Sequence, residues 1–197
     1  MSEPGLRERK KAKTRRAIQD AALALIAEQG YEATTVEQIA AAAEVSPSTC
    51  FRYFPTKEDI ILADEYDPEI FAALVEGGSG PPVEVIRSAL AGLFRRIYAA
   101  DRDVLYQRIL LCLEVPSVRS RMHEGINEAL QLMTKALATR FGVDPDNFEL
   151  QMANAAALGV MTRAIERWAE RGGTEDLPSQ VDAALSLLGR GFAETAG

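Results

Sequence analysis

Helical periodicity runs through almost the whole chain and excludes most alternatives to an all-α fold. Apolar residues recur every three or four positions in one segment after another, a spacing that places them on one side of an α-helix. The first such stripe contains Ile18, Ala22, Leu25 and Ile26. No stretch of useful length alternates apolar and polar residues, so we expect no sheet. The sequence therefore predicts an all-α protein of about nine helices.

Local capping signals divide the N-terminal third into short helices. Gly30 is a typical stop after the first helix. Thr35 is a candidate N-cap for a second helix, and Ser46 for a third. Thr56 can cap a fourth helix, with Asp59 three residues further on in a capping-box-like position. The second and third predicted helices are only about eight residues long and are joined by residues 43–46.

Two short helices joined by a tight turn form a helix-turn-helix, and this is the strongest functional signal in the chain. The second helix of such a unit can enter the major groove of DNA, which is about 12 Å wide. Its predicted exposed residues are Pro47, Ser48, Thr49, Arg52 and Tyr53.

These side chains are of the types that contact DNA. Arg52 can bridge the acceptors of a guanine, and Thr49 can touch a thymine methyl group or a phosphate. Tyr53 can donate to a phosphate. Lys57 begins the next helix, where a cation and free backbone N–H groups can hold a phosphate.

The net charge of −7, taken for the chain as a whole, argues against a nucleic-acid partner. The distribution of charge along the chain removes this objection. Residues 1–20 carry seven basic and three acidic side chains, whereas residues 61–197 hold the whole deficit. Such asymmetry is typical of a nucleic-acid-facing end joined to an acidic body. A solvated basic tail is the alternative explanation.

The spacing of several motifs carries a family resemblance. The segments are Gly30-Tyr31, Ala33 to Ala40, Val45-Ser46 and Phe51 to Glu58. Together they resemble the DNA-binding domain of TetR-family transcriptional regulators over about residues 12–65. The resemblance implies a homodimer that binds a palindromic DNA operator and is released by a small-molecule effector. By position, the family's DNA contacts fall on Thr35, Ser46, Ser48, Thr49, Phe51, Arg52, Tyr53 and Lys57.

A narrower likeness concerns the effector. Residues 51–59 together with residues 64–68 resemble a branch of the family whose C-terminal domain takes mycofactocin-type or acyl-CoA-like ligands. The likeness implies a small apolar or amphipathic effector.

The turn departs from the family pattern at Glu44, where glycine is frequent. A left-handed backbone would cost a glutamate about 1–2 kcal/mol, so we expect a slightly different turn here.

The domain boundaries follow from the motifs and from the Gly- and Pro-rich stretch near residue 80. We expect a flexible basic arm over residues 1–11 and a DNA-binding domain over residues 12–66, with the helix-turn-helix at about 35–54. A linker region over residues 67–82 then leads to a regulatory domain over residues 83–197 that binds ligand and dimerises.

Within the regulatory domain, large apolar residues are candidates for a ligand cavity or for plain core. They are Phe94, Tyr98, Tyr106, Leu110, Met122, Ile126, Met133 and Met161. Near-heptad spacing in the last two predicted helices suggests a dimer seam. Its candidate residues are Leu158, Ile165, Trp168, Leu185, Leu188 and Phe192.

The sequence contains no set of residues typical of a catalytic or metal-binding site. His123 is the only histidine, and Cys50 and Cys112 are far apart and read as core residues. We therefore expect no catalytic residues, metal or cofactor. The chain lacks an apolar run of the roughly 20 residues that a membrane span needs, which predicts a cytoplasmic protein. The remaining alternatives are an activator, a ligand-blind regulator, or an all-α carrier or enzyme with an incidental helix-turn-helix.

Overall fold

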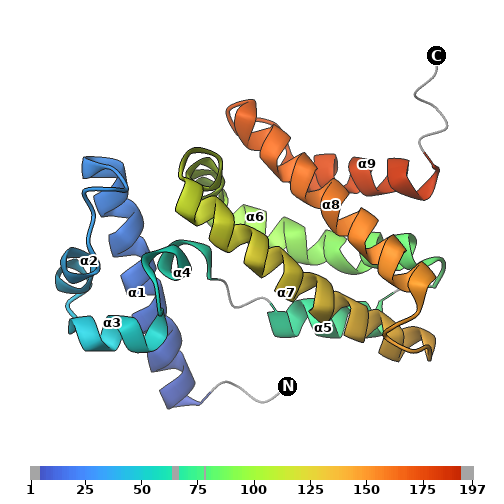
Figure 1. Cartoon of the computed structure of the whole chain (residues 1–197), viewed down its shortest axis with the longest axis horizontal. Coiled ribbons are helices and arrows are strands. Elements are labelled where there is room, and N and C mark those ends of the chain that lie inside the picture. Colours follow the sequence, from blue (N-terminus) through green and yellow to red (C-terminus); the bar gives the residue numbers. More distant parts are fainter. Residues whose placement is uncertain (1–4, 64–66, 78, 192–197) are drawn as a thin grey trace. The chain divides into compact units, whose positions relative to one another are not determined.

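The computed structural model describes residues 5–63, 67–77 and 79–191, and every regular element in these ranges is an α-helix (Figure 1). Two compact units are present, and each is described by itself. Unit 1 comprises residues 1–63 and 115–121, and unit 2 comprises residues 64–114 and 122–197. The all-α prediction is confirmed. Among the described residues, no helix combines the length and the apolar composition of a membrane span.

Unit 1 contains four short or medium helices and the beginning of a fifth. These are α1 (Leu6–Gln29), α2 (Val36–Ala42), α3 (Pro47–Tyr53), α4 (Lys57–Leu62) and the first turns of α7 (Pro116–Phe141). Helices α1, α2, α3 and α4 enclose one small core (Figure 1). Its buried residues are Ile18, Ala22, Ile39, Ala40, Cys50, Phe54 and Ile60.

The predicted helix caps are confirmed. Thr35 and Gln38 form a capping box at the start of α2, and Thr56 and Asp59 form another at the start of α4. The Ser46 side chain accepts from the backbone N–H of Thr49 at 3.1 Å. Because each cap satisfies backbone groups locally, the ends of these helices are fixed by residues three positions apart.

The turn between α2 and α3 corrects one expectation. Glu44 has a φ of 56°, so the turn is left-handed at a non-glycine residue, and the prediction of a different turn is wrong. Two backbone hydrogen bonds close the turn. The N–H of Glu44 donates to the carbonyl of Ala41 at 3.1 Å, and the N–H of Val45 donates to the carbonyl of Ala40 at 2.9 Å. The unit therefore retains the sharp turn and bears the steric cost of a Cβ in this conformation.

The start of α1 corrects a second expectation. Residues 6–11, predicted as part of a flexible arm, are helical and continue directly into α1. Residues 1–4 of the predicted arm lie outside the described residues.

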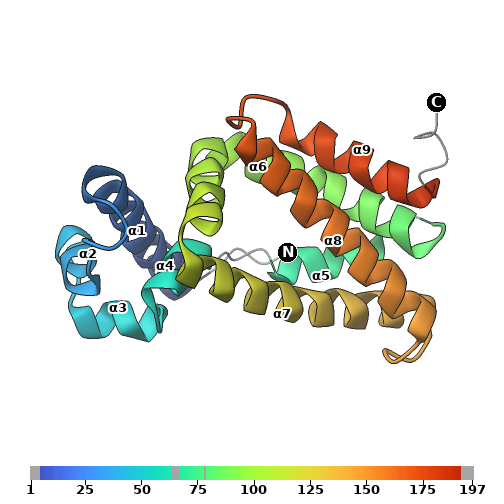
Figure 2. The same cartoon turned by 45° about the horizontal axis from the view of Figure 1, so that its top comes forward.

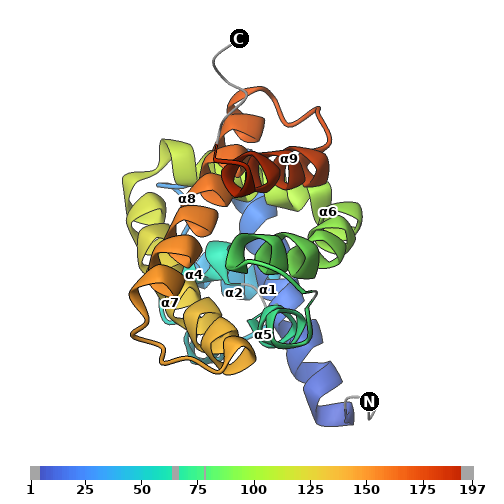
Figure 3. The same cartoon turned by 90° about the vertical axis from the view of Figure 1, so that its right-hand side faces the viewer.

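Unit 2 consists of α5 (Asp67–Glu76), α6 (Pro82–Glu114), the remainder of α7, α8 (Phe148–Glu170) and α9 (Leu177–Gly189). Helix α9 lies against both α6 and α8 (Figures 2 and 3). Trp168 is fully buried near the end of α8, with Tyr98 and Tyr106 packed edge-on at centroid distances of 6.0 and 5.6 Å.

One part of unit 2 differs from the sequence expectation. The predicted linker region 67–82 contains helix α5, whose Leu74 is fully buried in the unit. By contrast, the two helices expected near residues 86–97 and 104–113 are both present as the two arms of α6, which are separated by a kink at Asp101, where the backbone is non-helical (φ −141°). Periodicity therefore predicted both arms of α6 and missed only α5 among the helices in the described ranges.

Candidate DNA-binding site

Helix α3 presents a row of hydroxyl groups at its N-terminal end. The Ser46 Oγ lies 2.9 Å from the Ser48 Oγ and 2.9 Å from the Thr49 Oγ1. Pro47 occupies the first helical position, where its missing N–H costs nothing. Ser46, Pro47 and Ser48 are exposed and Thr49 is half-buried. These groups can both donate and accept hydrogen bonds, as contacts with base edges and phosphates require.

The two faces of α3 differ sharply. Cys50 and Phe54, on the inner side, are 0% and 1% exposed, whereas Phe51 is 47% exposed. Arg52 is exposed, with its guanidinium carbon 5.4 Å from the ring centroid of the half-buried Tyr53. The helix is therefore anchored by one face and offers the other, with its cation, to a partner.

Lys57 has a role that the sequence did not reveal. Its ammonium donates to the backbone carbonyls of Tyr31 at 2.8 Å and Thr34 at 2.9 Å, and it lies 3.8 Å from the Tyr31 ring centroid. These contacts fix the loop between α1 and α2, at whose end Thr35 is exposed. Two of the three ammonium hydrogens are used within the unit, and the phosphate contact of Lys57 stays a prediction.

A polar cluster links α4 to the first turn of α7 inside unit 1. The Tyr31 hydroxyl donates to the Glu58 carboxylate at 2.6 Å and lies 3.2 Å from the Ser117 Oγ. Burial, together with the neighbouring Glu58, raises the pKa of Tyr31 to about 12. Burial alone would raise the pKa of Glu58, but the hydrogen bonds from Tyr31 and Ser117 hold it below its ordinary value.

Asp59 completes this cluster with an ion pair. Arg121 Nε donates to Asp59 Oδ1 at 2.8 Å, while the other carboxylate oxygen accepts from Thr56. Burial opposes the charge, but these donors hold the pKa of Asp59 below its ordinary value. Sequence reasoning missed the pair because its residues are 62 positions apart and no local pattern connects them.

The predicted cavity residues lie mainly within or beside the core of unit 2. Met133 and Met161 are 3% and 6% exposed. Phe94 lines a small hollow of about 10 Å³ between α6 and α9. The others are half-buried, namely Tyr98, Tyr106, Leu110, Met122 and Ile126. Their role as a ligand cavity stays a prediction.

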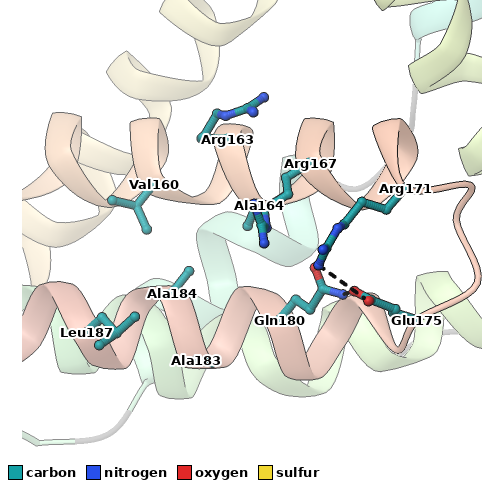
Figure 4. Close-up of a pocket in the computed structure, with 10 residues that line it drawn as sticks. All are labelled: Val160, Arg163, Ala164, Arg167, Arg171, Glu175, Gln180, Ala183, Ala184 and Leu187. Atoms are coloured by element: carbon teal, nitrogen blue, oxygen red, sulfur yellow. Dashed lines mark hydrogen bonds and ion pairs between the residues drawn. The ribbon is translucent and has the colours of Figure 1, made fainter. Parts of the chain in front are cut away.

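Two larger hollows are formed by other residues of unit 2. One, of about 580 Å³, lies between α8 and α9 (Figure 4), and the other, of about 440 Å³, lies between α7 and α8. In Figure 4, Arg167 and Arg171 extend toward α9, whereas Arg163 points away from it. Arg163 pairs with Glu170 at 2.9 Å and Arg171 lies 3.6 Å from Glu175, while Arg167 has no ion pair among the described residues.

The predicted dimer seam needs correction. Trp168 is 0% exposed and Leu185 is 1% exposed, so neither can touch a partner chain. Leu158, Ile165 and Leu188 are half-buried against the same core, and Phe192 lies outside the described residues. The near-heptad stripe is the core-facing side of α8 and α9.

The opposite face of α8 is apolar and open. Phe148 is 71% exposed and Met152 is 48% exposed. Ala155, Ala156 and Gly159 follow along the exposed side. A surface of large and small apolar side chains of this kind is typical of an interaction site.

Known proteins resemble the chain over both units. The family model described as "Bacterial regulatory proteins, tetR family" matches residues 18–63, and the one described as "MftR C-terminal domain" matches residues 80–193. The HTH-type transcriptional regulator TcmR of Streptomyces glaucescens is 33% identical over 94% of this chain and 87% of its own length. The HTH-type transcriptional repressor KstR of Rhodococcus jostii is 26% identical over 95% and 88%.

A solved structure supports the same relationship. The crystal structure of Thermus thermophilus FadR, a TetR-family repressor in complex with lauroyl-CoA, aligns with a TM-score of 0.56. It is 28% identical and the alignment covers 93% of this chain and 97% of that one. The chain thus belongs to the TetR family of bacterial transcriptional regulators.

Proposed function

We propose that this regulator represses transcription as a homodimer in the cytoplasm, on a palindromic operator, and leaves the operator when unit 2 binds an amphipathic effector. The observation that carries the proposal is the asymmetry of α3. One face is locked into the core by Cys50 and Phe54, and the other presents Arg52, Phe51 and three hydroxyl groups. The chain acts by binding, as its regulator relatives do, rather than by catalysis.

The contacts of α3 divide into two kinds. Arg52 carries base recognition, because a guanidinium can donate two parallel hydrogen bonds to a guanine. The hydroxyl groups of Ser48, Thr49 and Tyr53 hold the helix in register on phosphates. The basic residues at the start of α1 add sequence-independent attraction that weakens with salt.

The second copy of the chain covers the outer face of α8. Phe148 and Met152 are too exposed for large apolar side chains of a monomer, and Ala156 and Gly159 allow a second helix to approach closely. This face continues into the hollow beside α9, where Ala183 and Leu187 form apolar walls (Figure 4). A two-fold dimer places two copies of α3 one turn of DNA apart, about 34–36 Å, and requires a palindromic operator.

An acyl thioester of coenzyme A is the first candidate effector. Thermus thermophilus FadR, which is similar along nearly its whole length, was crystallised with lauroyl-CoA. Such a molecule combines a long apolar chain with a polar head, as an apolar hollow with a few polar groups requires. It releases DNA only if it binds the non-operator state of the dimer more tightly than the operator state.

Selection from a random duplex library tests the proposal. The immobilised full chain should enrich a two-fold symmetric sequence, with two protomers on each selected duplex. Addition of lauroyl-CoA should then release the duplex, while free coenzyme A should not. Enrichment of no sequence contradicts the proposed operator recognition, and a stable complex at saturating lauroyl-CoA contradicts the proposed effector class.

A further inference from the structure

Phe51 is an exposed aromatic residue on the outer face of α3. It is 47% exposed, although its neighbour Cys50 is fully buried. Among the described residues of unit 1, the other large apolar side chain that is exposed is Leu6, in the first turn of α1. A single exposed apolar residue is ordinary on most protein surfaces. Here, however, it lies on the surface that is proposed to enter the major groove, so its partner is a part of the DNA.

Phe51 shares its side of α3 with Pro47 and Ser48. These residues precede it by four and three positions, a spacing that places their side chains next to one another on a helix. Both are exposed, and the proline ring adds apolar surface beside the phenyl ring. This side of α3 is therefore a small apolar surface, bordered by one hydroxyl group.

The cation of α3 lies beside this apolar surface and does not cover it. Arg52 follows Phe51 directly, and successive residues are about 100° apart around a helix. The guanidinium carbon of Arg52 lies 5.4 Å from the Tyr53 ring centroid, on the side away from Phe51. The outer face of α3 thus has one polar part, suited to hydrogen bonds, and one apolar part that needs a different kind of contact.

The major groove offers one apolar group that distinguishes a base pair. A phenyl ring has no hydrogen-bonding group, so it cannot replace the water lost from a phosphate or from a polar base edge. The C5-methyl group of thymine is apolar and projects into the major groove, where phenylalanine and other apolar side chains can contact it.

Thr49 is the alternative reader of such a methyl group, because its own side chain carries a methyl. It is only half-buried, but its Oγ1 lies 2.9 Å from the Ser46 Oγ, and its backbone N–H donates to the same oxygen at 3.1 Å. These contacts hold Thr49 at the N-terminal end of α3. It is also two positions from Phe51, so the two side chains do not face the same way.

We propose that Phe51, with Pro47 beside it, packs on the C5-methyl group of a thymine in each operator half-site. The inference rests on the proposed operator binding and makes Phe51 a specificity-determining residue for it. Phe51 reads a thymine through its methyl group, whereas Arg52 reads a guanine through hydrogen bonds.

Replacement of thymine by uracil tests this contact, because uracil pairs as thymine does and lacks only the methyl group. Each thymine of the operator selected from the random library is replaced in turn, in one half-site and then in both. Fluorescence anisotropy at a fixed salt concentration measures the affinity of the full chain. At one thymine position we expect a loss of about fourfold for one half-site and about 15-fold for both.

Three variants identify the residue that reads the methyl group. In Phe51→Ala the ratio of thymine to uracil affinity should fall to about one at that position, and in Phe51→Leu part of the ratio should remain. In Thr49→Ser, which loses a methyl group and keeps the hydroxyl, the full ratio should remain. Each ratio compares two duplexes with the same protein, so a partly unfolded variant does not distort it.

Several outcomes overturn the inference. A ratio of about one at every thymine with the natural chain does so and leaves the proposed operator recognition intact, because Phe51 then packs on sugars, which uracil does not alter. A selected half-site that contains no thymine has the same meaning. A ratio that persists in Phe51→Ala and disappears in Thr49→Ser assigns the methyl contact to Thr49 and also overturns the inference. Enrichment of no sequence contradicts both the operator recognition and this contact.

Discussion

Arg121 Nε donates to Asp59 Oδ1 across 2.8 Å, and this contact makes the first turns of α7 a part of the DNA-binding unit. Asp59 also completes the capping box of α4 by accepting from Thr56, so one carboxylate serves both helices. Helix α7 runs without interruption from Pro116 to Phe141, and only its beginning belongs to unit 1. The ion pair therefore fixes the end of a helix that both units share.

Arg121→Met should weaken unit 1. The substitution keeps the aliphatic stem but leaves the largely buried Asp59 carboxylate without its main donor, which costs about 1–3 kcal/mol of unfolding free energy. Chemical denaturation should show this loss, and NMR titration should show the pKa of Asp59 rising. Arg119→Met, at an exposed position of the same turn, is the control and should change neither quantity. An unchanged pKa of Asp59 in Arg121→Met contradicts the structural role.

Acid should destabilise unit 1 through the same cluster. The pKa values of Glu58 and Asp59 are lowered in the folded unit, so their contribution is present above the unfolded pKa values of about 4. It is lost as the pH falls through the folded values. Unfolding free energy measured against pH should thus fall below about pH 4, and the fall should be smaller in Asp59→Asn. An equal fall in both proteins contradicts the assignment.

Alkali should destabilise unit 1 through Tyr31. Its pKa is raised to about 12, above the unfolded value of about 10. The stabilisation is complete below the unfolded pKa and is lost as the pH rises through the folded one. Tyr31→Phe should be less stable at neutral pH but should lose less stability between about pH 10 and 12. An ultraviolet titration in which every tyrosine of the natural chain ionises near pH 10 contradicts this account.

Glu44→Gly should stabilise the protein. Glycine adopts the φ of 56° without a Cβ clash, and the gain of about 1–2 kcal/mol is partly offset by the greater freedom of glycine in the unfolded chain. We expect a net gain of about 0.5–1 kcal/mol by chemical denaturation. Glu37→Gly, in the first turn of α2, should instead lose up to about 1 kcal/mol. A loss in both variants would mean that the glutamate side chain itself stabilises the turn.

Met152→Glu should produce monomers. A carboxylate on the exposed apolar face of α8 is buried without a partner when two chains meet, which is strongly unfavourable. Sedimentation should show the loss of dimers, while helical content is unchanged. Thr139→Glu, at an exposed position of α7, should remain dimeric. Persistent dimers of Met152→Glu place the interface on another face.

The sequence predicted those features that depend on interactions between residues close together in the chain. The caps at Thr35, Ser46 and Thr56 act over three residues, so the helix-turn-helix was predicted with its boundaries. Periodicity identified the apolar stripe of Trp168 but not what covers it, because core and interface select similar residues.

Contacts between distant residues had no signal at all. Lys57 resembles an exposed cation in the sequence, yet it is bonded to carbonyls 23 and 26 positions away. The Arg121–Asp59 pair and the Asn154–Thr134 pair likewise depend on how helices meet. Helix α5 was missed because Pro68 and the glycines that follow favoured a linker, although Pro68 stands near the start of that helix, where proline is tolerated.

Comparison of the natural chain with Arg52→Ala on operator and scrambled duplexes tests the central claim most directly. Fluorescence anisotropy over a series of salt concentrations measures all four affinities. The natural chain should prefer the operator by at least about 1,000-fold, with affinity falling steeply with salt. Arg52→Ala should lose about 1–3 kcal/mol on the operator and little on the scrambled duplex. Equal affinity of the natural chain for both duplexes, or an equal loss on both in Arg52→Ala, contradicts sequence recognition through α3.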